Sequence, residues 1–104
     1  MSFETGQLLF TSSISDQASN NKHFSEFIHS CITRHISEDF GELEEDDMNA
    51  NKAALFTGAR IFSAYEVPTS LLKLSKDPKL WIITEAENHE HKRSVTTLLW
   101  PSEY

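Results

Sequence analysis

The spacing of the apolar residues changes at Gly58, near the middle of this 104-residue chain. Before Gly58, apolar side chains recur every three or four positions, as on one face of an α-helix, and after it they alternate with polar ones, as along β-strands. A chain of this length forms one domain, so the two halves share a core. We therefore predict a single α+β domain over residues 1–104.

Two helices are predicted in the first half. The first spans residues 22–37, and Gly41 marks the exit of the chain from it. The second spans residues 48–57, with Asp46 or Asp47 as its N-cap and Gly58 as its stop. Residues 12–21 are rich in Ser, Asp and Asn and are predicted to be a loop.

Strands are predicted at four places where β-branched and aromatic residues gather: residues 7–11, 61–67, 80–85 and 94–100. Trp81, in the third of them, is expected to be structural. The connection at 86–93 is typical of a polar hairpin loop, and the longer one at 68–79 contains two prolines. We expect a short N-terminal strand, two helices and a three-stranded antiparallel meander, with the helices on one face.

The chain carries 16 Asp and Glu against 9 Lys and Arg, a net charge of -7. Proteins that bind nucleic acid directly cluster Lys and Arg, so direct binding is not expected. Most of the excess lies in one run, to which belong Glu42, Glu44, Glu45, Asp46 and Asp47. These carboxylates either imitate phosphates and occupy the basic groove of a protein partner, or only cap the second helix.

The single cysteine, Cys31, excludes an internal disulfide. No apolar run approaches the roughly 20 residues that cross a membrane, and the N-terminal region lacks a basic segment before an apolar one. No glycine-rich nucleotide loop is present. We expect a cytoplasmic protein without cofactor or membrane partner.

Several short segments resemble one family of small bacterial proteins. The segments are Arg34-His35, Asp39-Phe40-Gly41, Asn51, Ala54-Leu55, Gly58, Arg60, Ser63-Ala64-Tyr65, Trp81-Ile82-Ile83-Thr84-Glu85, Arg93-Ser94, Thr96-Thr97-Leu98-Leu99, Pro101 and Glu103-Tyr104. They are similar to plasmid- and phage-borne proteins often labelled plasmid-related protein or type I restriction endonuclease subunit M, whose activity is not established.

The restriction label is misleading, because a DNA methyltransferase needs a doubly wound domain and a base pocket that 104 residues do not supply. The chain also departs from the family pattern. Phe40 stands where a tryptophan is usual, Trp100 lies between Leu99 and Pro101, and the segments at 68–79 and 86–92 are longer than usual.

Cys31, His35 and Asp39 follow one another at intervals of four, so on a helix they lie along one face. A thiol, an imidazole and a carboxylate are the parts of a nucleophilic relay. The same positions belong to the apolar stripe, which favours a structural role in which His35 donates to Asp39 or to a backbone carbonyl. No catalytic residue is therefore assigned.

Glu85, Glu87, His89 and His91 alternate, and on an extended segment they would present metal-binding groups on one side. A solvated turn explains the same residues, and no metal site is assigned.

The remaining candidates lie on the strands or at their ends. Arg60, Tyr65, Glu85, Arg93 and Ser94 would gather as an interaction patch, because Arg and Tyr anchor many protein interfaces. Alternatively, Arg60 and Glu85 form a cross-strand ion pair that only holds the register.

Together these features predict a small, acidic, non-enzymatic module that binds a protein. Given the resemblance, an inhibitor or modulator of a nucleic-acid-handling defence enzyme, of restriction or CRISPR type, is the form we expect. Two alternatives remain: a minimal hydrolase or nuclease that uses His35, Asp39 and Glu85, and a structural homodimer formed through Trp100 and Tyr104.

Overall fold

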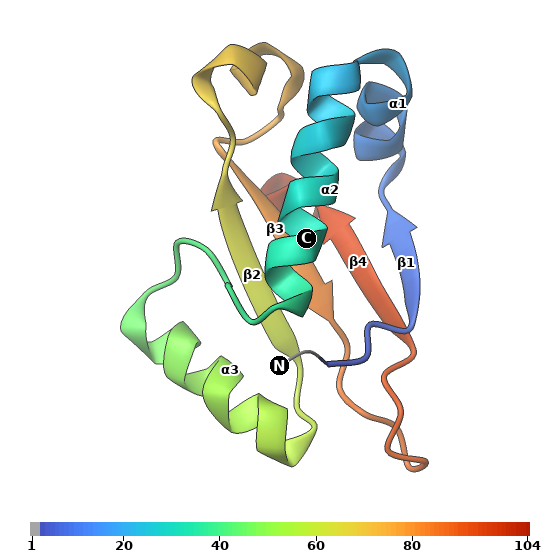
Figure 1. Ribbon diagram of the computed structural model, residues 1–104, viewed down its shortest axis with the longest axis vertical. Coiled ribbons are helices and arrows are strands. Elements are labelled where there is room, and N and C mark those ends of the chain that lie inside the picture. Colours follow the sequence, from blue (N-terminus) through green and yellow to red (C-terminus); the bar gives the residue numbers. More distant parts are fainter. Residues whose placement is uncertain (1–2) are drawn as a thin grey trace.

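The computed structural model of the chain describes residues 3–104, which form one mixed four-stranded sheet with helices around it (Figure 1). The elements in order are β1 (Gln7–Phe10), α1 (Ser12–Asn20), α2 (Lys22–Ile36), α3 (Glu45–Thr57), β2 (Ile61–Glu66), the 3-10 helix η1 (Thr69–Leu74), β3 (Lys79–Thr84), β4 (Val95–Leu99) and the 3-10 helix η2 (Pro101–Glu103). The predicted α+β class is confirmed.

The sheet itself differs from the predicted meander. Its strand order is β1-β4-β3-β2, and β2, β3 and β4 are antiparallel as predicted. However, β1 lies parallel to β4, with Leu8 opposite Thr96 and Phe10 opposite Leu98. The sheet is therefore mixed and four-stranded. The pairing of β1 was not predicted because a partner strand that lies far along the chain leaves no local signal in the sequence.

The predicted loop at residues 12–21 is wrong, since most of it forms helix α1. Ser and Asn are weak helix formers, but Ile14 is fully buried and Ala18 packs against the main core. Tertiary packing therefore overrides a poor local propensity. Asn21 ends this helix and also begins α2, where its side chain accepts a hydrogen bond from the backbone N–H of Phe24 at 3.0 Å.

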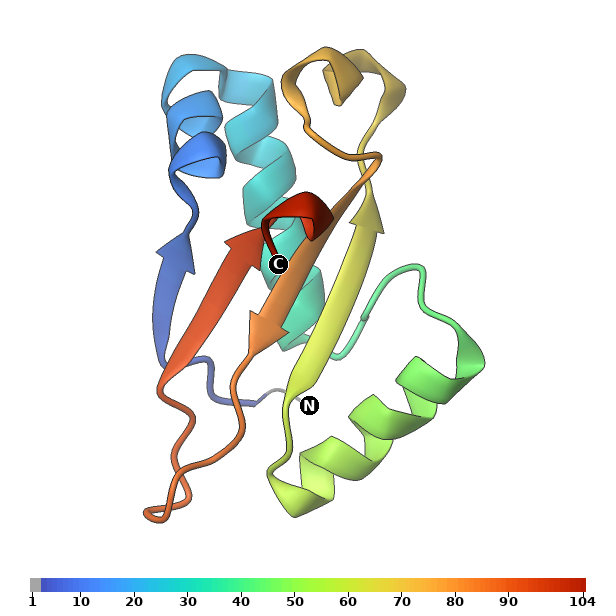
Figure 2. The same cartoon turned by 180° about the vertical axis from the view of Figure 1, so that it is seen from behind.

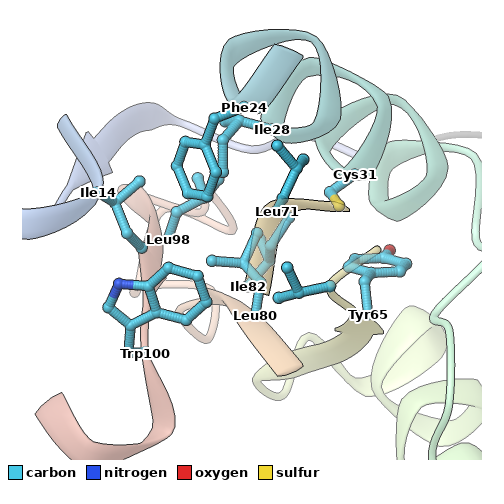
Figure 3. Packing of buried hydrophobic residues seen from close by; sticks show 11 residues of the cluster. Ile14, Phe24, Ile28, Cys31, Tyr65, Leu71, Leu80, Ile82, Leu98 and Trp100 are labelled. Carbon is cyan, nitrogen blue, oxygen red and sulfur yellow. The ribbon is translucent and has the colours of Figure 1, made fainter. Parts of the chain in front are cut away.

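Helix α2 follows its predicted range closely and covers one face of the sheet (Figure 1). Its side chains Phe24, Ile28 and Cys31 pack on a sheet layer made by residues that alternate along β2, β3 and β4 (Figure 3). That layer consists of Tyr65, Leu80, Ile82 and Leu98, with Trp100 at its margin. Residues two positions apart on β3, with their cross-strand neighbours on β2 and β4, thus form the covered face of the sheet.

Helix α3 lies beside the outer edge of β2 rather than over the face covered by α2 (Figures 1 and 2). The side chain of Asn51 donates to the carbonyl of Phe62 at 2.6 Å and accepts from its N–H at 3.0 Å. The N-cap of α3 is Glu44, so the prediction of Asp46 or Asp47 is wrong, whereas Gly58 ends the helix in the left-handed conformation as predicted.

Gly41 does not end the preceding helix, because α2 stops at Ile36. Instead it has a φ of 77° and forms a parallel bridge with Ala64 on β2. A Cβ on this residue would collide with the carbonyl oxygen of Ala64. Gly41 is therefore needed for the close approach of the loop to β2.

The carboxylate of Glu103 holds the C-terminal turn against the start of α1. It accepts hydrogen bonds from Ser13 at 2.7 Å, Thr11 at 2.8 Å and the backbone N–H of Trp100 at 2.9 Å, and it pairs with Lys76 at 3.3 Å. Burial alone would raise the pKa of this carboxyl, but these donors outweigh it and lower the pKa to about 2.

Replacing Glu103 with glutamine should therefore lower the free energy of unfolding by about 2–3 kcal/mol at pH 7. The contribution is present above the unfolded-state pKa of 4.5 and is lost as the pH falls from there toward 2, so the variant should lose less stability than wild type over that range. Urea titrations at pH 7 and pH 3 measure both effects. Glu90→Gln, at the exposed hairpin tip, is the control, and equal stability of wild type and Glu103→Gln would contradict the assignment.

Candidate interaction surface

The face of the sheet that α1 and α2 leave uncovered is the near side of the sheet in Figure 2. A row of aromatic side chains lies on this face. Phe62 on β2 and Trp81 on β3 meet edge to face, with ring centroids 5.0 Å apart. Trp81 in turn meets Tyr104, which follows η2, at 5.8 Å. Trp81 was expected to be structural, yet it is only half-buried and lies on this open face.

This aromatic row forms the floor of a groove. Two adjoining hollows of about 430 and 270 Å³ share Asp47, Phe62 and Trp81, so they are parts of one depression. The first hollow has four acids on its lining, namely Glu42, Glu44, Asp47 and Asp77. We call this depression, with its aromatic floor and acidic wall, the acidic groove.

The acids of the wall differ in how they are engaged. Glu42 accepts a hydrogen bond from the backbone N–H of Glu66 at 3.0 Å, and Asp77 binds the backbone and side chain of Ser102. Glu44 and Asp47 line the groove, and within residues 3–104 no hydrogen-bond or ion-pair partner contacts the exposed carboxylates of the run Glu44, Glu45, Asp46 and Asp47. The last three form the first turn of α3, where the helix dipole favours negative charge.

Two basic side chains border the acidic groove. Arg60 does not form the expected ion pair with Glu85, and instead donates to the hydroxyl of Tyr104 at 2.7 Å. Lys79 lies 3.4 Å from the carbonyl oxygen of Glu42. The groove is therefore acidic along the α3 side and has one cation at each end.

The predicted patch of strand residues does not form, because two of its members are buried on other sides of the sheet. Tyr65 lies in the main core, donates its hydroxyl proton to the carbonyl of Asp39 at 2.7 Å, and has its pKa raised by burial. Arg93 is 5% exposed and donates to the carbonyls of Ala54, Ala59 and Glu85. It fastens the end of α3 to the sheet.

Glu85 and Ser94 are exposed and flank the hairpin between β3 and β4. Of the five predicted patch residues, only Arg60 lines the acidic groove. The patch prediction is wrong because the alternation along β2 places Tyr65 on the covered face.

His35 belongs to a buried chain of polar groups rather than to a reactive site. Its Nδ1 contacts the hydroxyl of Ser63, and its Nε2 lies 2.8 Å from that of Thr84. Thr84 continues to Thr96 at 2.7 Å, and Thr96 donates to the carbonyl of Thr5. Because the hydroxyl proton of Thr96 is donated to Thr5, the Thr84 hydroxyl must donate to Thr96 and accept from Nε2–H of His35. The unprotonated Nδ1 of His35 then accepts a hydrogen bond from the Ser63 hydroxyl.

This arrangement gives His35 a structural role but not with the expected partner. Asp39 pairs with Arg34 at 2.8 Å instead of with His35. Burial lowers the pKa of His35 to about 4 and raises that of the Cys31 thiol to about 12. A neutral, enclosed imidazole beside a protonated thiol is not an activated nucleophile.

The acidic and histidine residues of the hairpin do not form a ligand set. Residue 91 takes a left-handed turn with φ of 61°, which breaks the alternation, and His91 lies 3.7 Å from Glu87. Among the residues that the structure describes, no group of three or more His, Cys, Asp or Glu side chains is arranged to hold a metal ion.

Sequence reasoning missed Phe62 and Asp77 as members of the acidic groove. A signal was present, because residues 80–83 are four consecutive apolar residues rather than an alternating set. Such a strand is apolar on both faces, which predicts that something covers the second face as well. The alternating neighbours at Phe62 and Ala64 pair with Ile83 and Trp81 and extend this apolar surface.

Comparison with known proteins gives no further guide. No model of a protein family matches the sequence, and no curated protein or solved structure shows significant similarity to it. Across residues 3–104, every helix is too short or too polar to cross a membrane.

Proposed function

We propose that this protein is a non-enzymatic interaction module whose acidic groove binds a basic surface of a protein partner. The observation that carries the proposal is the placement of partnerless carboxylates along an open aromatic floor. Trp and Tyr side chains supply apolar contact area, and Trp and Tyr rings also attract Arg and Lys side chains. An Arg-rich segment or surface therefore suits the groove on both counts.

The class of partner follows from the charge. Protein surfaces with enough Lys and Arg to fill such a groove are typical of proteins that bind nucleic acid. The resemblance to plasmid- and phage-borne proteins favours a partner from host defence. We therefore propose that the module inhibits or modulates a nucleic-acid-handling enzyme of restriction or CRISPR type.

The enzymatic alternative lacks comparable support. His35 is 1% exposed and both of its ring nitrogens are engaged, so no substrate reaches it. Asp39 is held by Arg34, and Glu85 lies on the exposed segment that enters the hairpin. None of these three residues lines either hollow of the acidic groove.

Neutralising the unpartnered acids of the wall, Glu44 and Asp47, together with the adjacent Glu45 and Asp46, tests the proposal. The combined replacement of Glu44 and Glu45 by glutamine and of Asp46 and Asp47 by asparagine should weaken binding of an Arg-rich peptide about tenfold or more, because four attractive charges are lost. The dependence of affinity on salt should also flatten. Fluorescence anisotropy of the labelled peptide, measured over a range of salt concentrations, gives both quantities.

A matched control neutralises four exposed acids elsewhere: Glu4, Asp16, Glu26 and Glu90. Both variants have the same net charge, so non-specific attraction changes equally in the two. The proposal predicts that only the variant of residues 44–47 loses affinity. An equal loss of affinity in both variants would show that peptide binding depends only on the net charge of the protein, and the acidic groove would not be a binding site.

A further inference from the structure

The two edge strands of the sheet, β2 and β1, differ in whether their outward-facing backbone groups are hydrogen-bonded. On β2, the outward-facing backbone groups are occupied by groups from residues before the strand. Asn51 bonds the N–H and carbonyl of Phe62, the backbone of residues 40–42 bonds those of Ala64, and the Glu42 side chain takes the N–H of Glu66. This edge is closed to further strand pairing.

The opposite edge, β1, is open. The N–H groups of Gln7 and Thr11 face β4, bonding the carbonyls of Ser94 and Leu98. The backbone N–H and carbonyl groups of successive strand residues point alternately to the two edges of the strand. The groups of Leu9 therefore also point toward β4, whereas the N–H and carbonyl of Leu8 and Phe10 point away from the sheet. In the described chain, no strand lies on that side of β1.

The open edge is also apolar and uncharged. Leu8, Leu9 and Phe10 are 38%, 40% and 40% exposed, and β1 contains no charged residue or proline of the kind that usually protects an edge. The acidic run lies on α3 and the loop before it, beside the opposite edge of the sheet (Figure 1). Two copies that met through β1 would therefore keep their acidic runs apart.

The outward groups of β1 are self-complementary. In an antiparallel pair centred on Leu9, Leu8 of one copy lies opposite Phe10 of the other. Each such pair exchanges two hydrogen bonds, so every outward N–H and carbonyl of Leu8 and Phe10 in both copies is satisfied. The two Leu9 residues then face each other on the dyad as a non-hydrogen-bonded pair.

A groove of about 340 Å³ lies where the second copy would place its side chains. Phe10 lines it together with Ala18 of α1 and Ile28 and Ile32 of α2. Phe10 pairs with Leu98, a core residue, and so lies on the helix-covered face of the sheet. Leu8 of the second copy, opposite Phe10, projects from the same face and borders this groove.

From these observations we infer that the protein forms a twofold homodimer through antiparallel pairing of β1 with β1 of a second copy, giving one continuous eight-stranded sheet. Leu8 of each copy covers the apolar side of this groove in the other, whose remaining lining is Ser15, Ser19, Ser25 and His29. The dimer leaves both acidic grooves free, because they lie near the β2 edges. It differs from the expected interface through Trp100 and Tyr104, of which Trp100 is fully buried and Tyr104 is exposed.

Sedimentation equilibrium at concentrations up to hundreds of micromolar tests the association. Wild type should approach twice the 11.9 kDa of one chain. Leu8→Pro removes an outward N–H without touching the β1–β4 ladder and should remain a monomer. Phe56→Lys, which removes a 92% exposed apolar side chain on α3, should still dimerise. A monomeric wild type, or a Leu8→Pro variant that dimerises like wild type, would overturn the inference.

The register is tested by cross-linking, which remains informative if Leu8→Pro fails to fold. Leu9→Cys places two thiols opposite each other at a Cα separation of about 4.5 Å, within disulfide range, so oxidised glutathione should convert most of it to a covalent dimer. Leu8→Cys is the matched control, because its two thiols are offset along the strands. Cross-linking of Leu8→Cys as fast as Leu9→Cys contradicts the pairing, and neither result bears on peptide binding in the acidic groove.

Discussion

Replacing His35 with leucine is expected to lower the free energy of unfolding by about 3 kcal/mol at pH 7 and to remove the loss of stability that His35 causes as the pH falls from 6.5 to about 4. The loss at pH 7 arises because Ser63 and Thr84 are buried and their hydroxyls lose the imidazole as a partner. Each unsatisfied buried polar group costs about 1–3 kcal/mol. The leucine recovers part of this through apolar contacts.

The acid effect follows from the pKa of His35, which is about 4 in the folded chain and 6.5 in the unfolded one. Above pH 6.5 both states hold the neutral ring, so titration does not affect stability. As the pH falls from 6.5 to 4, the unfolded state takes up the proton first, and wild type loses about 3 kcal/mol. The Leu variant has no such loss, so the gap between the two proteins closes near pH 4.

Urea unfolding at pH 7, 6, 5 and 4, followed by circular dichroism, measures the gap directly. His29→Gln, on the exposed side of the same helix, is the matched control, and its free energy of unfolding should depend on pH as that of wild type does. If the free energy of unfolding of His35→Leu falls with pH as steeply as that of wild type, the buried polar chain does not hold a neutral imidazole.

The second large effect is expected at Arg93. Replacing it with methionine keeps the length of the side chain but removes three hydrogen bonds, to the carbonyls of Ala54, Ala59 and Glu85 at 3.1, 2.7 and 3.0 Å. Hydrogen bonds from a charged donor contribute more than neutral ones, and we expect a loss of about 3–5 kcal/mol. Because these bonds fix the C-terminal end of α3, amide hydrogen exchange should accelerate most in that helix.

Arg60→Met is the matched control, since Arg60 is exposed and donates only to the Tyr104 hydroxyl. Its replacement should cost less than about 1 kcal/mol. Equal stability of the two variants would contradict the role of Arg93 as a buried residue that holds the end of α3 to the sheet through hydrogen bonds. It would favour the interaction role that its place in the sequence suggested.

Much of the fold was predictable from local spacing. The stripe of Phe24, Ile28 and Cys31 predicted α2, and the period-2 segments predicted β2, β3 and β4 in antiparallel order. Helix α1 was not predictable in this way, because Ile14 alone is fully buried and the Ser-rich remainder has low helix propensity. The parallel place of β1 depends on pairing with residues nearly 90 positions away.

The site was less predictable than the fold. The acidic residues were identified as a run, but their neighbours across the sheet were not, because Phe62 and Trp81 meet only when β2 and β3 pair. Conversely, Arg93 and Tyr65 were assigned to a surface because of their residue type. Tyr65 is buried because it lies on the covered face of β2, and Arg93 is buried because it bonds carbonyls at and just after the end of α3 and at Glu85.

The most direct test of the acidic groove is an NMR titration with an Arg-rich peptide, observing backbone amides and both tryptophan indoles. We predict saturable shifts centred on the Trp81 indole, Phe62 and residues 44–47, with the indole of buried Trp100 nearly unchanged. Shifts at saturation that cluster over α1 and α2, or a Trp81 indole that does not move, would contradict the proposal.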